Sequence, residues 1–443
     1  MGGAVVNERK TQIVIVGGGA AGLELARRLG ARYGRKHHDI ILVDQHATHI
    51  WKPLLHEVAT GALDANLDGV GYRGHAYRWG YRYFFGTFES IDRAARRIVI
   101  APLLDDRGEE LIGRHAIRYD YLVIAVGSVT NDFGVPGVSD HCLFLDDRDQ
   151  ADRFRARLLN HCLRVSRAMS ADPAADARVR VAIVGAGATG VELSAELYNA
   201  AAALRHYGLE TFDESRLQVT LIEAGPRILP ALPEALAEAA HVELETLGVT
   251  VRVATPVVSV NDKGVRTGAG DLIEADLRVW AAGVKAPAFL AGIGGLETNS
   301  AQQIIVRPTL QSTRDARIFA IGDCCFCRAP GTDRPIPTRA QAAHQMASAA
   351  AANLGRLMDT RPLKAFVYRD HGSLVSLSRF SSVGTLMGGL IGGRLAIEGR
   401  LAKFVYASLY RQHLLAIHGW LKGAALIALG RVNTIVRPRL KLH

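Results

Sequence analysis

Two glycine-rich stretches have the residue types and the spacing that bind the pyrophosphate of a dinucleotide. In the first, VGGGAAG, Gly17, Gly19 and Gly22 form a G-x-G-x-x-G pattern between an apolar strand and a helix. The first glycine permits a tight turn, the second lets the backbone approach a pyrophosphate, and the third lets helix and strand pack closely. The next strand ends in Asp44, whose carboxylate suits a ribose hydroxyl. We therefore expect a dinucleotide site here, with the phosphates at the helix N-terminus.

The pattern recurs further along the chain, in VGAGATG. Gly185, Gly187 and Gly190 follow another apolar strand, and the strand after the helix ends in Glu223. An acidic residue at that point favours NADH, because it would repel the 2′-phosphate of NADPH. Arg227 lies close enough in sequence to leave that preference open. A degenerate repeat that binds nothing is the alternative.

Two such motifs in one chain resemble the two-dinucleotide flavoprotein oxidoreductases, in which the first site holds FAD and the second holds NAD(P)H. YDYLVIAVGS, which contains Gly127, is similar to the strand and turn that link the two domains of that superfamily. TRDARIFAIGD is similar to its second FAD signature, which includes Gly322. The resemblance implies that Asp323 holds the ribityl chain or a flavin phosphate. A structural turn aspartate is the alternative.

The cysteines do not match the pattern of a disulfide reductase. Disulfide reductases of this superfamily carry a redox cysteine pair soon after the first glycine motif, and residues 20–65 contain no Cys. Cys324, Cys325 and Cys327 follow the second FAD signature in GDCCFC. A C-x-x-C spacing can bind a metal or form a disulfide. With no second ligand cluster in the sequence, we expect these thiols to pack as small residues and expect no metal site; a redox or metal role is the alternative.

A helix predicted from about Arg339 carries side chains that suit a carbonyl-bearing acceptor. Its sequence, TRAQAAHQMASAAAANLGRLM, is rich in Ala, the best helix former. Gln341 and Gln345 are four residues apart and share one face. Together with His344 they could donate hydrogen bonds to such an acceptor. Taken alone, the segment could equally carry ordinary surface amides.

Three stretches narrow the resemblance to the type II NADH:quinone oxidoreductases, the single-subunit NADH dehydrogenases that pump no protons. These stretches are AQAAHQMA, HIWKPLLHEVATGAL and VGAGATGVELSAEL, and the similarity covers nearly the whole chain, including the basic end IVRPRLKLH. In that family the AQ-x-x-x-Q helix lines the quinone site beside the flavin. The resemblance therefore implies that Gln341 and Gln345 contact quinone.

The same resemblance implies roles for residues outside that helix. Glu192, after the third glycine of the second motif, is implied to lie near nicotinamide and flavin, where it would orient NADH or relay protons. A helix-surface glutamate is the alternative. Trp51, Lys52 and Pro53 fall where the family's loop covers the isoalloxazine ring. Thr60, in the same stretch, is counted with the cofactor-binding residues.

The C-terminal part of the chain is both basic and apolar. The chain has a formal net charge of +10, and residues 394–443 carry nine Lys or Arg and one acid, which gives +8 for this part alone. A basic tail suits nucleic acid or an anionic membrane. The apolar residues mixed into it favour the membrane, and we expect no nucleic-acid partner. Five Cys in 443 residues favour a reduced compartment.

The uncharged runs in this tail are too short for a helix that spans a bilayer. Ten residues separate Arg411 from Lys422 and eight separate Lys422 from Arg431, whereas a span needs about 20. We predict a strand hairpin over VGTLMGGLIGGRLAIEG and two helices from about Gly399 to Leu429. These helices would lie on the cytoplasmic face of the cell inner membrane, apolar side down. A core or homodimer helix pair is the alternative, and it can coexist with membrane docking.

These patterns predict an α/β fold with two Rossmann-like dinucleotide-binding domains and a C-terminal α+β membrane-docking region. The FAD domain is expected to comprise residues 1–147 and 286–372, with an NADH domain at 148–285 inserted in it. Residues 373–443 form the membrane-associated region. Within the inserted part, residues 151–176 are interpreted as a helix and linker.

The predicted reaction passes a hydride from NADH to bound FAD and two electrons on to a membrane quinone, without proton pumping. Sulfide:quinone oxidoreductase shares the FAD core and membrane docking, but it would need cysteines beside the flavin. Cys162 with Cys324 or Cys327 is a conceivable set, and the intact second glycine motif argues against it. The alternative from another class is a redox-sensing or binding flavoprotein with a basic tail.

Overall fold

The computed structural model describes residues 9–34, 38–204, 209, 211–329, 331, 334–377, 381–387, 394–398 and 410–436. The chain divides into two compact units. Unit 1 comprises Met1–Trp51, Gly69–Val129 and Lys285–Arg369. Unit 2 comprises Lys52–Asp68, Thr130–Val284 and Asp370–His443. Each unit has its own parallel sheet.

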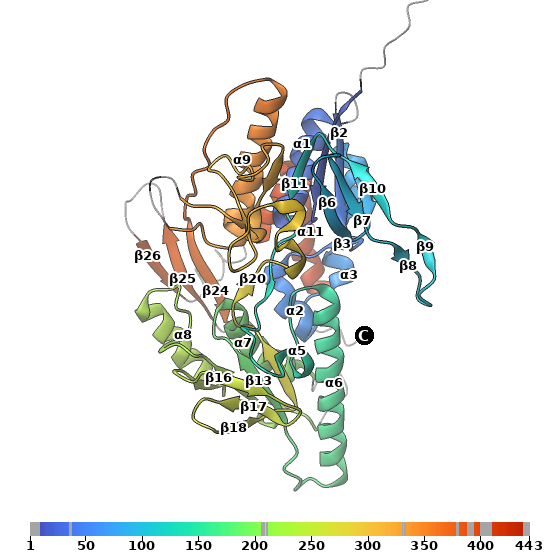
Figure 1. The fold of residues 1–443 in the computed structure, drawn as a ribbon. Coiled ribbons are helices and arrows are strands. Elements are labelled where there is room, and N and C mark those ends of the chain that lie inside the picture. The colour runs from blue at the N-terminus through green and yellow to red at the C-terminus, as the bar shows by residue number, and fades with distance from the viewer. Residues whose placement is uncertain are drawn as a thin grey trace, which may run out of the picture. The chain divides into compact units, whose positions relative to one another are not determined.

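Unit 1 is built on a five-stranded parallel sheet with the order β22-β11-β1-β2-β5; Figure 1 labels β2 and β11 of this sheet. Its strands are β1 (Thr11–Val16), β2 (His38–Asp44), β5 (Arg82–Phe85), β11 (Tyr121–Ile124) and β22 (Ile318–Ala320). The central strand β1 pairs with β2 and β11, and residues 13–16 are buried. A continuous apolar run is what a parallel strand covered on both faces requires. The turn after β1 therefore opens at the carboxyl edge of this sheet.

Helices and short sheets complete unit 1. α1 (Ala20–Tyr33) follows β1 and packs against α9 (Ala340–Met358), which confirms the helix predicted from about Arg339. α4 (Tyr72–Trp79) packs against α1 and β5. The remaining strands are β3 (Thr48–His49), β4 (Val70–Gly71), β6 (Phe88–Asp92), β7 (Arg97–Ile100), β8 (Leu103–Leu104), β9 (Glu110–Ile112), β10 (His115–Arg118), β21 (Ile304–Ile305) and β23 (Cys325–Phe326).

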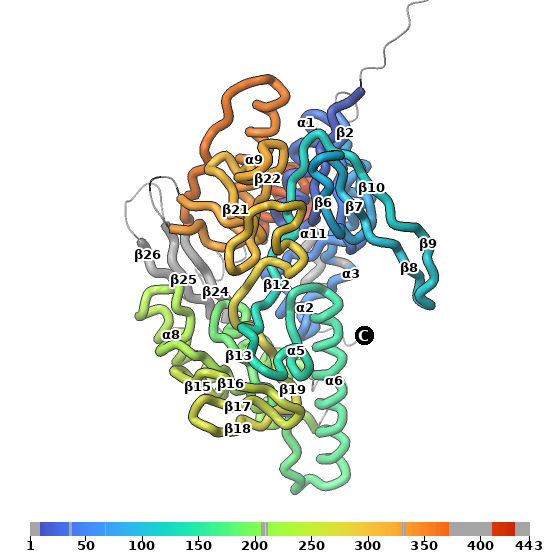
Figure 2. The backbone as a smooth tube through the Cα atoms, in the orientation of Figure 1, coloured from blue at the N-terminus to red at the C-terminus, as the bar shows by residue number. Residues whose placement is uncertain are grey.

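Unit 2 repeats the plan on a four-stranded parallel sheet with the order β15-β14-β13-β19. Its strands are β13 (Val179–Val184), β14 (Leu217–Ile222), β15 (Thr250–Arg252) and β19 (Leu277–Trp280). Its helices are α2 (Leu55–Thr60), α3 (Ala65–Asp68), α5 (Val138–His141), α6 (Arg148–Ala171), α7 (Ala188–Leu204) and α8 (Glu234–Thr246). α2 contacts both α6, the long helix in Figure 2, and α7.

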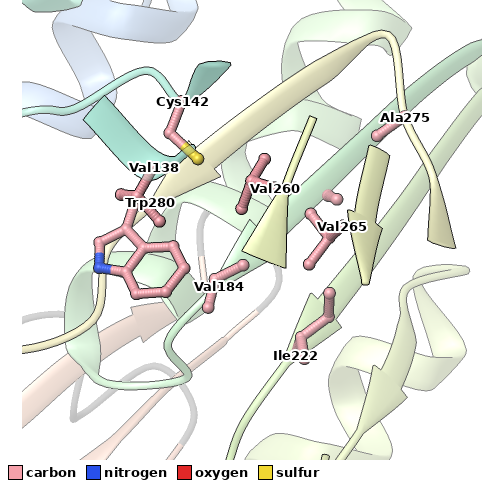
Figure 3. Close-up of a cluster of buried hydrophobic side chains, with 9 residues drawn as sticks. Val138, Cys142, Val184, Ile222, Val260, Val265, Ala275 and Trp280 are labelled. Atoms are coloured by element: carbon pink, nitrogen blue, oxygen red, sulfur yellow. The ribbon is translucent and has the colours of Figure 1, made fainter. Parts of the chain in front are cut away.

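An apolar cluster fixes the carboxyl ends of the unit 2 strands (Figure 3). Val184, Ile222 and Trp280 are the last residues of β13, β14 and β19. They pack with side chains from an antiparallel sheet of β16 (Val257–Val260), β17 (Gly264–Thr267) and β18 (Leu272–Glu274). The whole cluster comprises Val138, Cys142, Ala182, Val184, Ile222, Val260, Val265, Ala275 and Trp280. The second glycine turn, which follows β13, therefore starts from a rigid base.

The C-terminal elements belong to unit 2. An antiparallel sheet comprises β24 (Gly372–Leu377), β25 (Ser381–Met387) and β26 (Arg394–Glu398), which confirms the predicted hairpin. Residues 410–418 and α11 (Trp420–Val436) are helical, and the predicted helix start at 399–409 lies outside the described residues. Among the residues that the structure describes, no helix is both long and apolar enough to cross a membrane.

The α/β class with two Rossmann-like dinucleotide-binding folds is confirmed. The assignment of residues 1–147 with 286–372, 148–285 and 373–443 to three functional parts stays a prediction. Two short elements, β12 (Val129–Thr130) and β20 (Val284–Lys285), lie at the unit boundaries. The predicted helix and linker of residues 151–176 correspond to α6, which ends at Ala171, and to the non-helical segment that follows it.

Candidate active site

The turn between β1 and α1 has the backbone geometry that the first glycine pattern predicts. Gly17 has a φ of 99°, and a Cβ there would lie 2.4 Å from the Ala125 carbonyl oxygen. A Cβ on Gly22 would lie 1.8 Å from the Gly17 carbonyl oxygen. A Cβ on Gly19 would meet nothing within 4 Å, and Gly19 caps α1 with no side-chain hydrogen bond. Packing therefore requires the first and third glycines, while the second leaves space at the helix N-terminus for a phosphate.

Asp44 closes this turn from the end of β2. Its Oδ2 accepts the Gly18 N–H at 2.6 Å and its Oδ1 accepts the His46 N–H at 2.8 Å. The Tyr72 hydroxyl donates to the Gly18 carbonyl at 2.8 Å. Burial lowers the pKa of His49 to about 4, against the opposing effect of Asp44. A carboxylate, a phenol and a neutral imidazole thus surround the loop.

The turn between β13 and α7 has the same construction. Gly185 has a φ of 102°, and a Cβ there would lie 2.6 Å from the Ala282 nitrogen. A Cβ on Gly190 would lie 2.0 Å from the Gly185 carbonyl oxygen, and a Cβ on Gly187 would meet nothing within 4 Å. This second turn therefore has the same open space at a helix N-terminus as the first.

Glu223 closes the second turn as Asp44 closes the first. Its Oε2 accepts the Ala186 N–H at 2.9 Å, and its Oε1 accepts the Gly225 N–H at 2.8 Å. The Arg227 guanidinium donates to carbonyl oxygens of its own loop, including that of Leu232 at 2.9 Å. These bonds hold the Arg227 guanidinium against its own loop. They therefore favour Glu223, and not Arg227, as the residue that sets the preference between NADH and NADPH.

The second FAD signature lies beside the first glycine turn. Gly127 and Gly322 have φ angles of 74° and 75° in turns that follow the neighbouring strands β11 and β22. The Ser128 hydroxyl donates to Asp323 Oδ2 at 3.0 Å, and Gln303 Nε2 donates to the Asp323 carbonyl at 2.9 Å. Since β11 pairs with β1, the structure brings these residues to the same carboxyl edge as Gly17.

The cysteines are free and buried. Cys324 Sγ donates to the carbonyl oxygens of Ile124 and Ile321. Burial raises the pKa of Cys324 to about 12, of Cys327 to about 11 and of Cys162 to about 12. Protonated thiols are poor nucleophiles and metal ligands. Their burial and raised pKa values favour packing. Within the described ranges there is no group of three or more His, Cys, Asp or Glu that could hold a metal ion.

The glutamines of α9 bind the chain segment that follows the helix. The Tyr368 hydroxyl donates to Gln341 Oε1 at 2.6 Å. Gln345 Nε2 donates to the Arg369 carbonyl at 2.7 Å, and the Arg369 N–H donates to Gln345 Oε1 at 2.9 Å. The two amides thus bond to the successive residues Tyr368 and Arg369 from one helix face. Gln345 both donates to and accepts from the Arg369 backbone, as an adjacent β-strand would.

His344 lies on another part of α9 and contacts α1. Its Nδ1 lies 2.5 Å from Glu24 Oε2, and Arg28 Nε donates to Glu24 Oε1 at 2.7 Å. Glu24 is 2% exposed. Burial alone would raise the pKa of Glu24, but the hydrogen bond and charge of His344, aided by Arg28, hold it below its usual value. The prediction grouped His344 with the two glutamines, and the structure adds this contact with Glu24 within the core of unit 1.

Glu192 begins a row of titratable groups within unit 2. It is 6% exposed, and its Oε2 lies 3.6 Å from His56 Nδ1. Burial lowers the pKa of His56 to about 4, so its ring is neutral at pH 7. His56 Nε2 lies 4.0 Å from Glu57 Oε1. Burial, with the charges of Glu196 and Asp68, raises the pKa of Glu57 to about 8. The two separations exceed hydrogen-bond distance, and small movements of the side chains would have to close them before a proton could pass.

The loop residues fall in both units. Trp51 is 8% exposed and belongs to unit 1. Lys52 and Pro53 begin unit 2 and are exposed, and Lys52 Nζ donates to Asp146 at 3.0 Å. The buried Thr60 hydroxyl donates to the His56 carbonyl at 3.1 Å. Inside unit 2, Thr60 therefore stabilises α2, which holds the imidazole beside Glu192.

Sequence reasoning missed Glu24, Tyr72, His56 and Glu57. Glu24 could have been found as an ionisable residue on the apolar face of the helix after the first glycine motif. His56 and Glu57 lie within HIWKPLLHEVATGAL, where only the loop residues and Thr60 were selected. Tyr72 carries no signal, because its bond to Gly18 depends on how α4 packs.

Comparisons with known proteins give one consistent result. Residues 11–347 match the family model described as pyridine nucleotide-disulphide oxidoreductase. The type II NADH:quinone oxidoreductase of Haemophilus influenzae is 45% identical, over 97% of this chain and 99% of the relative. NDH2 from Plasmodium falciparum in complex with NADH has the same fold, with a TM-score of 0.79, 20% identity and coverage of 98% and 100%. The sulfide:quinone oxidoreductase of Aquifex aeolicus matches less closely, with a TM-score of 0.69, 18% identity and 92% of each chain covered.

Proposed function

We propose a division of roles among the residues of this chain from one premise: it belongs to the pyridine nucleotide-disulphide oxidoreductase family and, within it, to the type II NADH:quinone oxidoreductases. Its activity is the transfer of electrons from NADH to a quinone. FAD, when bound, supplies the redox chemistry by accepting a hydride from NADH and passing two electrons on. The protein must bind, orient and separate the partners.

The first glycine turn is the proposed FAD phosphate site. Its support is the open space at Gly19, set in a loop that Gly17 and Gly22 hold in place. Asp44 would exchange its bond with the loop for a ribose hydroxyl. Asp323, with Gly127 and Gly322 in turns at the same sheet edge, would hold the ribityl chain or a flavin phosphate. Trp51, Lys52 and Pro53 would cover the ring, and Thr60 would support that loop.

The second glycine turn is the proposed NADH site. Gly187 leaves open space at the N-terminus of α7, between the tightly packed Gly185 and Gly190. Glu223 would bind the ribose hydroxyls and repel a 2′-phosphate. Glu192 would orient the nicotinamide or move a proton, supported by its burial and by His56 at 3.6 Å.

The quinone site is proposed on the face of α9 that carries Gln341 and Gln345. Gln341 would donate its amide N–H to a quinone carbonyl while Tyr368 holds its oxygen. Gln345 already makes two bonds to the Arg369 backbone, which favours a positioning role in this state. His344, paired with Glu24, would hold the orientation of α9 against α1.

The decisive experiment is anaerobic. NADH is added to the purified yellow protein, the flavin absorbance is followed, and a water-soluble quinone is then added. The expected result is bleaching followed by rapid recovery. Bleaching without recovery would reject the quinone as acceptor, and an absence of bleaching would reject the second glycine turn as the NADH site.

A matched pair of variants tests the quinone site. Gln341→Leu should slow recovery by quinone about tenfold, as expected for one lost hydrogen bond to an acceptor, and leave bleaching by NADH nearly unchanged. Gln218→Leu, which removes an exposed glutamine from β14, is the control and should change neither step. Equal losses in both half-reactions of Gln341→Leu would refute the assignment.

The sulfide:quinone alternative has weaker support. It needs reactive cysteines, whereas burial raises the pKa of Cys162 and Cys324 to about 12. The Aquifex aeolicus enzyme is similar in fold alone. Rapid bleaching by sulfide in place of NADH would reverse this choice.

Membrane docking is proposed for the helix pair at residues 410–436. The pair turns at Gly419, and a Cβ on Gly423 would lie 2.9 Å from Leu415 Cα, so the two helices pack closely. Trp420 and Leu421 are 75% and 78% exposed, beside Lys422. Exposed apolar side chains next to a basic one suit an anionic bilayer surface. The helix pair would dock on the cytoplasmic face of the inner membrane.

Flotation with anionic vesicles tests the docking surface. Trp420→Ser combined with Leu421→Ser should release most of the protein from vesicles, while NADH still bleaches the flavin. Leu163→Ser combined with Val242→Ser removes exposed apolar side chains from α6 and α8 and should leave binding intact. Unchanged flotation of the first variant, with loss of a homodimer in solution, would assign this surface to a second copy instead.

A further inference from the structure

A hollow at the amino end of the unit 2 sheet is lined by more positive than negative side chains. It has a volume of about 290 Å³ and is formed by α6, the end of α5 and the start of β19. The dinucleotide turn lies at the opposite, carboxyl end of these strands, so the hollow is a separate site. Its lining comprises His141, Leu143, Arg157, Asn160, His161, Arg164, Asp276, Leu277 and Arg278.

One stripe of α6 supplies much of the lining. Arg157, Asn160, His161 and Arg164 recur at helical spacing and so share a face. Both arginines are exposed, and within the described part of the chain neither takes part in an ion pair. The guanidinium groups of this stripe therefore keep their hydrogen-bond donors and charge available to a ligand.

Arg278 is fixed in position by neutral groups. Its Nε donates to the His141 carbonyl at 3.1 Å, and its Nη1 donates to the carbonyls of Asp262 and Ala275 at 2.7 and 2.9 Å. Carbonyl oxygens orient a guanidinium without neutralising it. Asp276, the acid in the lining, accepts a backbone N–H of β13 at 2.8 Å. The hollow thus presents three arginines against one carboxylate that already has a partner.

His161 responds to this excess of positive charge. Burial lowers its pKa, and Arg164, Arg278 and Arg157 lower it further, against the opposing effect of Asp276. A bound anion would offset the arginines and raise this pKa. The pKa of His161 therefore reports whether an anion is bound in the hollow.

We infer that this hollow binds a small soluble anion that carries at least two negative charges, of the phosphate class. Arginine forks match phosphate oxygens in pairs, and a preset guanidinium such as Arg278 loses little entropy on binding. The volume is close to the lower limit of about 300 Å³ for small-molecule sites, which suits a compact anion. The inference does not depend on the electron-transfer roles proposed above.

Calorimetric titration of the flavin-loaded protein with pyrophosphate tests this site, with excess NAD⁺ present to occupy the second glycine turn. The wild type should bind saturably. Arg157→Gln combined with Arg164→Gln should weaken binding at least about tenfold, because two charge-assisted contacts are lost. Arg153→Gln combined with Arg167→Gln removes the same charge from exposed positions of α6 outside the lining, and should change binding less than about twofold. Equal weakening in both variants, or no saturable binding to the wild type, would overturn the site.

The chemical shifts of His161 give a second readout. Pyrophosphate should raise the pKa of His161 in the wild type, whereas the Arg157/Arg164 variant should show a raised pKa without ligand and no further change. If citrate displaces pyrophosphate better than inorganic phosphate does, the ligand is a polycarboxylate and the assignment to the phosphate class is overturned. If phosphatidylglycerol vesicles displace pyrophosphate and free glycerol phosphate does not, the site binds a lipid head group. That result would overturn the proposal of a soluble ligand. A constant pKa of His161 throughout the pyrophosphate titration would place any bound anion elsewhere.

Discussion

Gly22 in unit 1 and Gly190 in unit 2 occupy the same place in two glycine turns, and a buried glutamate follows each by two residues. Glu24 is held by Arg28 at 2.7 Å and by His344 at 2.5 Å. Glu192 instead lies 3.6 Å from His56, whose pKa burial lowers to about 4. One glutamate has a cationic partner and a close imidazole bond; the other lies beside a neutral ring.

This difference separates a structural role from a chemical one. A buried carboxylate that is paired with a cation stays charged and fixes its neighbours, which suits the contact between α1 and α9. Glu192 instead has a titratable ring 3.6 Å away, which suits a group that orients a cofactor or moves a proton. The same position of one motif therefore serves as an anchor in unit 1 and, as proposed, as a working group in unit 2.

The largest expected effects come from the third glycines. Gly22→Ala places a Cβ 1.8 Å from the Gly17 oxygen, so the turn must open, at a cost of about 3 kcal/mol or more together with loss of FAD. Gly190→Ala creates the equivalent clash at 2.0 Å but should leave the protein yellow and unable to be bleached by NADH. In both variants, the flavin content measures the binding of FAD and anaerobic bleaching measures its reduction by NADH. Loss of flavin from both variants would mean that the two turns do not serve separate cofactors.

Replacement of each glutamate by glutamine should separate their roles. Glu24→Gln should lower the free energy of unfolding by about 2 kcal/mol, since Arg28 and His344 lose a buried anionic partner. Glu192→Gln should lower it by less than Glu24→Gln does, because a glutamine amide can still hydrogen-bond the neutral His56 ring 3.6 Å away, and it should slow flavin reduction by NADH. Urea unfolding and stopped-flow bleaching test both statements. The comparison fails if Glu192→Gln proves the more destabilising change.

A pH series tests the row of groups beyond Glu192. The folded-state pKa of Glu57, about 8, lies above its usual value of 4.5, so folding takes up a proton between these values. The contribution of Glu57 to the free energy of unfolding should therefore fall as the pH rises through that window, by about 1–2 kcal/mol for a side chain that is partly exposed. Burial also raises the pKa of the neighbouring Tyr410, which titrates above the window.

Glu57→Gln should remove this decline, and Glu238→Gln, an exposed glutamate of α8, should keep it. Chemical unfolding from about pH 5 to about pH 8.5 provides the measurement, a range that brackets the expected titration. A decline that persists in Glu57→Gln would assign the proton uptake to another group.

The second glycines should give the smallest change in stability. Gly19 has a φ of −63°, and a Cβ there or on Gly187 meets nothing within 4 Å. Gly19→Ala and Gly187→Ala should alter stability by less than about 0.5 kcal/mol. Each should weaken its own dinucleotide severalfold, which equilibrium dialysis of FAD and titration with NADH would detect. Unchanged affinities would mean that the open space does not receive a phosphate.

Local patterns predicted the elements well, while pairs distant in sequence were not predictable. The glycine turns, α9 and the hairpin of β25 and β26 follow from neighbouring residues, because turn chemistry and periodicity act over a few positions. The contact of Glu24 with His344 joins residues 320 positions apart. Nothing in either local sequence encodes it, since it arises when α1 and α9 pack.

The candidate site shows the same limit. Spacing placed Gln341 and Gln345 on one face of a helix, and the structure bears this out. That Gln345 would bond to the Arg369 backbone depends on the path of a segment without regular structure. A sequence pattern identifies a side chain with useful chemistry, but tertiary packing decides which partner it has.

The pair of bonds between Gln345 and Arg369 makes one amide serve two competing purposes. A molecule that takes the N–H or the oxygen lone pair now bonded to Arg369 must first detach the chain there, so binding of that kind on α9 and release of the segment form a single equilibrium. Hydrogen exchange at the Arg369 N–H would then measure how often the helix offers its amide, and a ligand that takes it would accelerate that exchange at a site it never touches.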